Sequence, residues 1–140
     1  MEEKVLINWS DNYSVGYAEI DEQHKKLVEM INTLYFSFTQ GDADKIIEPI
    51  LNEMIQYTDY HFKIEEEYFE KYNYPGKQEH KIEHQHFVEK ISTFHNDYKS
   101  GSITVSYEIM DFLKDWLISH IKTSDKKYSN YFKNQNMSKL

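Results

Sequence analysis

Cysteine is absent from this 140-residue sequence, and so is any long apolar run. Without thiols the chain can form neither disulfides nor thiolate metal sites nor a cysteine nucleophile, which fits a reducing compartment. The N-terminus lacks the basic start and apolar stretch of a signal peptide, and no segment approaches the roughly 20 apolar residues of a membrane-spanning helix. These absences predict a cytoplasmic protein that does not use a membrane as partner.

Positive charge is also scarce, with 16 basic against 24 acidic residues and a formal net charge of −8. This balance argues against nucleic acid or an anionic membrane as the main partner. A chain of this length commonly forms one domain. We expect a single domain over residues 1–140, with an N-terminal arm at 1–19, a bundle from about 20 to 122, and a C-terminal segment at 123–140.

Only four glycines and two prolines interrupt the chain, and the glycines stand between segments of helical periodicity. Asp21 is expected to cap the first helix, Pro49 to lie in the early turns of the second, and a break to follow residue 122. The pattern predicts an all-α fold, an up-down-up-down four-helix bundle with an irregular N-terminal arm and a short C-terminal turn or helix. The predicted inner stripes are His24, Leu27, Ile31, Leu34 and Phe38; Ile47, Leu51, Met54, Thr58, His61, Glu65, Tyr68 and Tyr72; His80, His84, Phe87, Ile91, Phe94 and Tyr98; and Val105, Ile109, Phe112 or Leu113, Trp116 and His120.

Histidines gather in four short segments, DEQH, HFKIE, HKIEH and HIKTSD. In the predicted topology these segments meet at one end of the bundle, and residues four apart within a segment share a helix face. Imidazole combined with carboxylate suits first-row transition metals such as iron. The candidate metal ligands are His24, His61, Glu65, His80, His84, His120 and Asp125.

The alternative is that each histidine is an ordinary hydrogen-bonded core residue. Five such residues and a glutamate at one level would be costly without a metal, since each unsatisfied buried polar group costs about 1–3 kcal/mol. Asp125 does not share the face of His120 on a regular helix, because five residues turn it about 140° away. It can reach the cluster only if the helix breaks near Thr123 and Ser124.

Neighbouring residues serve as internal controls. His86 points away from His84, and His95 lies about 16 Å further along the helix, so neither can reach the same metal. Glu66 and Glu67 rotate off the Glu65 face and are expected to be solvated charges.

Coordination counting favours two octahedral ions that share two bridging carboxylates. Five nitrogens, two bridging carboxylates and a bridging oxide or hydroxide leave one coordination position vacant, on the ion with fewer histidines. Such a vacancy suits a small diatomic ligand.

These segments resemble the hemerythrin family, in particular its bacterial branch. The likeness rests on WSDNYSVGYAEIDEQHKKL at 9–27, HFKIEE at 61–66, YPGKQEHKIEHQHF at 74–87 and WLISHIKTSD at 116–125. It implies two non-haem irons bridged by a carboxylate pair and an oxide or hydroxide, with reversible dioxygen binding for storage, delivery or sensing. The implied ligands are His80, His84 and His120 on one iron, His24 and His61 on the other, and Glu65 and Asp125 as bridges.

The resemblance also implies an apolar oxygen pocket. By position it consists of Leu27, Phe62, Trp116, Leu117 and Ile121, with Tyr128 nearby; packing as ordinary core remains the alternative for each. The implied partners are dioxygen and an oxygen-requiring enzyme or a reductase. A di-iron enzyme acting on peroxide, nitric oxide or ferrous iron is the alternative function, although ferritin-like enzymes use more carboxylates. We expect a non-enzymatic carrier.

Overall fold

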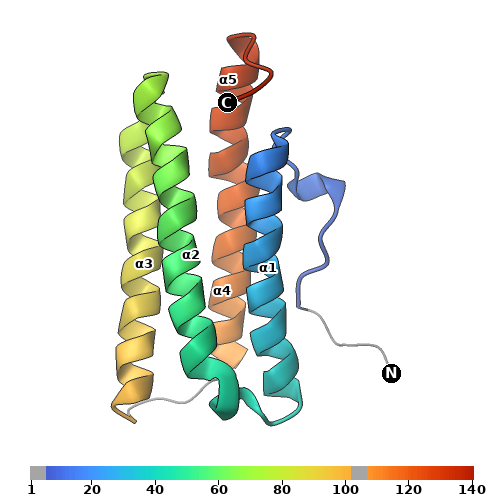
Figure 1. Ribbon diagram of the computed structural model, residues 1–140, viewed down its shortest axis with the longest axis vertical. Helices are drawn as coiled ribbons and strands as arrows, with labels where there is room; N and C mark the ends of the chain where they lie inside the picture. The colour runs from blue at the N-terminus through green and yellow to red at the C-terminus, as the bar shows by residue number, and fades with distance from the viewer. Residues whose placement is uncertain (1–5, 102–106) are drawn as a thin grey trace.

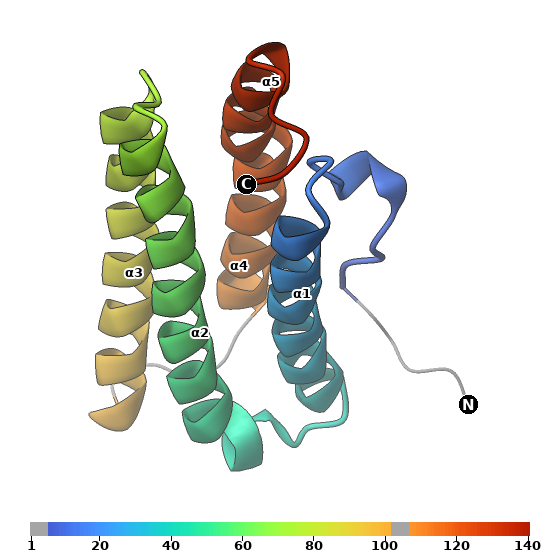
Figure 2. The same cartoon turned by 45° about the horizontal axis from the view of Figure 1, so that its top comes forward.

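The computed structural model describes residues 6–101 and 107–140. Its four long helices run alternately down and up the molecule (Figures 1 and 2), which confirms the predicted all-α, up-down-up-down four-helix bundle. The elements are η1 (Asp11–Tyr13), α1 (Ala18–Thr39), α2 (Ala43–Lys71), α3 (Lys77–Lys99), α4 (Tyr107–His120), η2 (Ile121–Asp125) and α5 (Lys126–Asn134).

Asp21 does not cap the first helix. The helix begins at Ala18, and Asp21 lies in its first turn. The Asp21 carboxylate instead accepts hydrogen bonds from the Ser14 hydroxyl at 2.5 Å and the Val15 amide at 2.8 Å. The capping prediction is therefore wrong, because this side chain holds the preceding arm against the helix.

Glycines end two of the helices, as their positions predict. Gly41 follows α1 with φ of +77°, and Gly101 follows α3 with φ of +80°. Both values lie in the left-handed region that glycine adopts without strain. The second helix continues through Pro49 to Lys71.

The predicted inner stripes of the first three helices are buried along most of their length, and only Phe38, Tyr68, Tyr72 and Tyr98 of these stripes are half-buried. Leu34, Ile47 and Leu51 are fully buried. The fourth predicted stripe is correct at His120 and at Leu113, one of the two alternatives for its position, and is one residue off at Ile109 and Trp116. Val105 lies outside the described residues. The buried apolar residues of α4 are Met110, Leu113 and Leu117, whereas Ile109, Phe112 and Trp116 are half-buried.

No break separates α4 from the C-terminal helix, so the prediction of a break at 123–124 is wrong. The segment η2 is a π-helical turn, in which the Lys126 amide donates to the Ile121 carbonyl five residues back. A π turn places residues five apart on one face of the helix. Asp125 therefore returns to the face of His120 without interruption of the helix.

The N-terminal arm runs beside α1 (Figure 1). The Asn32 side chain accepts hydrogen bonds from the Leu6 and Ile7 amides and donates one to the Ile7 carbonyl. Among the described helices, none is long and apolar enough to cross a membrane.

Candidate metal centre

The start of α1, the end of α2, the start of α3 and the end of α4 meet at the end of the bundle from which α5 continues (Figure 1). The seven predicted ligands lie there, and each is at most 4% exposed. They are His24, His61, Glu65, His80, His84, His120 and Asp125.

These side chains form two groups that share Glu65 and Asp125. In the larger group, His80 Nε2 and His120 Nε2 lie 3.0 and 3.1 Å from Asp125 Oδ1. His84 Nε2 lies 3.3 Å from Glu65 Oε1. Three imidazoles and both carboxylates therefore face one point.

The smaller group contains two imidazoles. His24 Nε2 lies 3.0 Å from Asp125 Oδ2, and His61 Nε2 lies 3.4 Å from Glu65 Oε1. Within each group, the ligand atoms all lie within 4.8 Å of one another. The arrangement offers two adjacent cation positions that differ by one imidazole.

Hydrogen bonding within the chain leaves this cluster unsatisfied. Among the residues that the structure describes, nine buried polar side-chain atoms have no hydrogen-bond partner, and eight of them belong to six of the seven candidate ligands, all but His61. Each such atom costs about 1–3 kcal/mol if nothing else binds it. A pair of cations between the nitrogens and oxygens would satisfy all eight of these atoms except His24 Nδ1, so the residues present fit a metal site.

The charge balance of the metal-free cluster also favours cations. Burial lowers the pKa of His61 to about 4. Burial opposes protonation of His120 as well, but the Asp125 charge raises the pKa of His120 to about 10. The pKa of Asp125 is held well below its usual value by His120, His24 and His80, which together outweigh burial. The carboxylates are thus charged at neutral pH and attract positive charge.

Three ligand histidines have a partner on the ring nitrogen that faces away from the cluster. His61 Nδ1 lies 2.6 Å from Gln23 Oε1. His84 Nδ1 lies 2.8 Å from Glu66 Oε2, and His120 Nδ1 lies 3.1 Å from Glu83 Oε1.

Sequence reasoning missed these three partners, and the prediction that Glu66 is a solvated charge is wrong. A usable signal existed, since Gln23, Glu66 and Glu83 each stand next to a ligand in the sequence. One helical residue turns the side chain by about 100°, toward a neighbouring helix.

Tyr128 is a further contact of the cluster. Its hydroxyl donates to Glu65 Oε2 at 2.5 Å, and both side chains are fully buried. Burial and the Glu65 charge raise the pKa of Tyr128 well above 10, so the hydroxyl stays protonated. It satisfies the carboxylate oxygen that does not face the histidines.

Aromatic side chains pack against the histidines of the cluster. Phe62 stacks on His84 with ring centroids 3.7 Å apart, and Trp116 stacks on His120 at 4.4 Å. The predicted pocket residues Leu27, Phe62, Leu117 and Ile121 are buried, and Trp116 is half-buried.

The two control histidines lie outside the cluster. His86 is exposed, and His95 Nε2 pairs with Glu48 Oε2 at 2.7 Å. Neither belongs to the two groups of candidate ligands.

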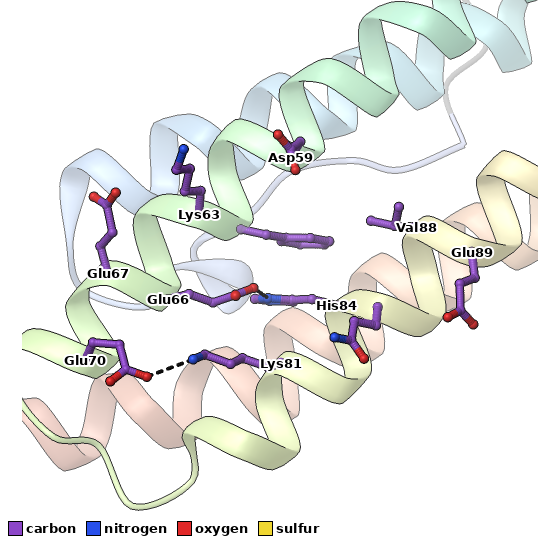
Figure 3. Close-up of a pocket in the computed structure, with 11 residues that line it drawn as sticks. Asp59, Lys63, Glu66, Glu67, Glu70, Lys81, His84, Val88 and Glu89 are labelled. Carbon is purple, nitrogen blue, oxygen red and sulfur yellow. Dashed lines mark hydrogen bonds and ion pairs between the residues drawn. The ribbon is translucent and has the colours of Figure 1, made fainter.

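A groove of about 950 Å³ between α2 and α3 reaches His84 from outside (Figure 3). Glu66 and His84 point toward each other across it, and Lys81 pairs with Glu70 at 2.8 Å. The partner of His84 therefore lies between the buried cluster and solvent.

A four-helix bundle with buried imidazoles and carboxylates at one end places this chain in the class of helical proteins that can hold metal ions. Residues 15–132 match the family model of the hemerythrin HHE cation binding domain. The chain belongs to the hemerythrin family, which confirms the resemblance seen in the sequence and supports binding of non-haem iron.

Curated relatives support the same family. The chain is 31% identical to a bacteriohemerythrin of Stenotrophomonas maltophilia over 128 residues, covering 91% of this chain and 82% of the relative. It is 37% identical to a hemerythrin-like protein of Naegleria gruberi over 121 residues, covering 86% and 89%. A crystal structure of wild-type hemerythrin superposes with a TM-score of 0.83 at 29% identity, covering 90% of this chain and 97% of that one.

Proposed function

We propose that the chain binds dioxygen reversibly at a non-haem di-iron centre, for oxygen storage, delivery or sensing. His80, His84 and His120 would hold one iron, and His24 and His61 the other. Glu65 and Asp125 would bridge the two, together with an oxide or hydroxide. The observation that carries this proposal is the unequal division of five imidazoles between two groups that share both carboxylates.

The unequal number of histidines in the two groups would leave room for an external ligand such as dioxygen. If both irons are octahedral, the one with two histidines has a vacant position and the one with three has none. The bound irons would supply the electrons for dioxygen binding.

The chain's own residues would then protect the bound ligand. Leu27, Leu117 and Ile121 are at most 4% exposed. In the proposed pocket they would exclude water and protons that would otherwise displace the ligand and leave the metals oxidised.

The small number of carboxylates favours a carrier over an enzyme. Among the described ligand candidates only Glu65 and Asp125 are acidic, against five histidines. Ferritin-like di-iron enzymes use paired Glu-x-x-His motifs and more carboxylate ligands. We therefore propose that the chain is not an enzyme and that its partners are dioxygen and a protein that consumes oxygen or returns electrons, in the cytoplasm.

Optical spectroscopy with iron analysis on the same sample tests this function. The purified protein should contain about two irons per chain. After reduction, air should produce a coloured adduct that bleaches under argon and forms again over several cycles. An adduct that converts to the oxidised state in one cycle, or rapid turnover of peroxide or nitric oxide with a reductant, would favour a di-iron enzyme over an oxygen carrier.

A further inference from the structure

The partners of the ligand histidines differ in charge between the two groups. In the larger group, His84 and His120 donate from Nδ1 to the carboxylates of Glu66 and Glu83, at 2.8 and 3.1 Å. In the smaller group, His61 donates to the neutral amide of Gln23 at 2.6 Å. The other histidine of that group, His24, has no hydrogen-bond partner on Nδ1 among the described residues.

The same rule of construction places all three partners. Gln23 of α1 reaches His61 of α2, and Glu66 of α2 reaches His84 of α3. Glu83 of α3 reaches His120 at the end of α4. Each partner therefore comes from the helix that precedes its histidine in the chain. The three contacts have the same architecture, and they differ in whether the acceptor is a neutral amide or a charged carboxylate.

A hydrogen bond to a carboxylate changes the electronic character of an imidazole ligand. The N–H donor shares its proton with the anion, the ring becomes more basic, and its other nitrogen donates more strongly to a metal. Stronger donation stabilises the ferric state more than the ferrous state, because the ferric ion carries the higher charge. An amide acceptor does this less, since it carries no net charge.

We infer that Glu66 and Glu83 lower the reduction potential of the metal held by His80, His84 and His120, relative to the metal held by His24 and His61. The inference rests on the proposed function, because it assumes iron at both positions. Both glutamates are positioning residues that act through His84 and His120. By comparison, the metal with the vacant position, whose histidines contact no carboxylate on Nδ1, would be the easier of the two to keep ferrous.

Glu83 is the better fixed of the two carboxylates. The Ser124 hydroxyl lies 2.7 and 2.8 Å from its two oxygens, which holds the group against His120. Glu66 lines the groove of Figure 3, where Lys81 is engaged with Glu70. Glu66 and Glu83 are 31% and 42% exposed, so water screens part of their charge and we expect effects at the lower end of the usual range.

Three variants test the inference by removing or adding a charge at matched sites, and a fourth is the control. Glu66→Gln and Glu83→Gln keep the hydrogen-bond acceptor and remove the charge, whereas Gln23→Glu adds a charge on the opposite group. Glu67→Gln is the control, because Glu67 is exposed and adjacent to Glu66. All four are analysed as iron-loaded protein, with iron content and melting temperature measured on the same samples.

The decisive measurement is the reduction potential in a mediated spectroelectrochemical titration. Glu66→Gln and Glu83→Gln should each raise the potential, by about a tenfold change in the ratio of ferric to ferrous affinity, or about 59 mV for one electron. Gln23→Glu should lower it, and Glu67→Gln should leave it unchanged. A purely orienting role would reduce iron content or melting temperature in all three partner variants without opposite shifts of the potential.

Unchanged reduction potentials in Glu66→Gln and Glu83→Gln at full iron content overturn the inference. A Gln23→Glu variant whose potential rises, as the potentials of the two Glu→Gln variants are expected to do, also overturns it. Should Gln23→Glu fail to fold, the two glutamine variants and the Glu67 control decide the matter. The proposed function fails separately, if the wild-type protein holds two irons but forms no reversible adduct. In that case the reduction potentials of the variants still test whether Glu66 and Glu83 lower the potential of the bound iron.

Discussion

Replacement of Tyr128 by Phe removes one fully buried oxygen atom and leaves the ring packing in place. The hydroxyl is the donor to Glu65 Oε2 at 2.5 Å, and both side chains are fully buried. The Tyr128 ring packs against Phe69 at 5.1 Å and His80 at 5.5 Å between centroids. The variant therefore isolates one hydrogen bond to a charged group.

The cost follows from the charge and burial of the acceptor. The pKa of Glu65 is lowered to about 2, since His61 and His84 outweigh burial and the Asp125 charge, so this carboxylate is ionised at pH 7. A hydrogen bond to a charged group contributes about 1.5–3 kcal/mol. For a domain of this size each kcal/mol corresponds to a few degrees in melting temperature, so Tyr128→Phe should melt roughly 6–12 °C lower.

Calorimetry of the metal-free protein at pH 7 measures this difference without the stabilisation that bound metal adds. Tyr60→Phe is the control, because Tyr60 is 54% exposed and loss of its hydroxyl should change stability by less than about 0.5 kcal/mol. A Tyr128→Phe variant that melts within a degree of the wild type would show that the hydroxyl does not stabilise Glu65.

Four further predictions concern the metal ligands and their surroundings. Glu65→Ala should reduce occupancy of both iron positions in elemental analysis, because both groups share this carboxylate, whereas Glu67→Ala should retain two irons. Removal of iron with a chelator should lower the melting temperature, since the unsatisfied cluster loses its cations; equal melting would contradict this. The metal-free protein should be most stable to urea near pH 6.5. Below that pH, unfolding takes up a proton at His61, whose pKa is about 4 only in the folded chain; above it, unfolding releases the proton that folded His120 holds up to a pKa of about 10. Both proton exchanges favour the unfolded chain. Leu117→Ala should speed autoxidation of the oxygen adduct, followed optically, at unchanged iron content.

Much of the fold could be predicted from the sequence because hydrophobic periodicity and glycine positions determine it. Leu34, Leu51 and Phe87 fall on their predicted stripes and are buried. The spacing of four between His61 and Glu65 and between His80 and His84 places each pair on one helix face, which regular helix geometry fixes. The structure brings these residues together, and their role as iron ligands remains a prediction.

The partners of the histidines could not be predicted by the same reasoning, because a stripe pattern assigns each position to the core or to solvent. Glu66 and Glu83 belong to neither class, with 31% and 42% exposure. Their contacts depend on which helix lies next to which, and a single helix's pattern does not contain that information. Gln23 is buried and close to a ligand, yet its acceptor role depends on the side-chain orientation of His61 in a second helix.

The π-helical turn η2 contains one residue more than a regular helical turn, and this changes the direction of both Asp125 and Tyr128. At regular helix spacing Asp125 would point about 140° away from His120. Because residues five apart align across a π turn, Asp125 instead reaches the cluster, and the regular helix that follows keeps this phase. Residues three, four and seven positions later then face the core as well, and all are buried: Tyr128, Ser129 and Phe132. The same turn that supplies one candidate bridging carboxylate therefore also brings the Tyr128 hydroxyl to the other, Glu65, so that a regular helix in place of η2 would remove both contacts together.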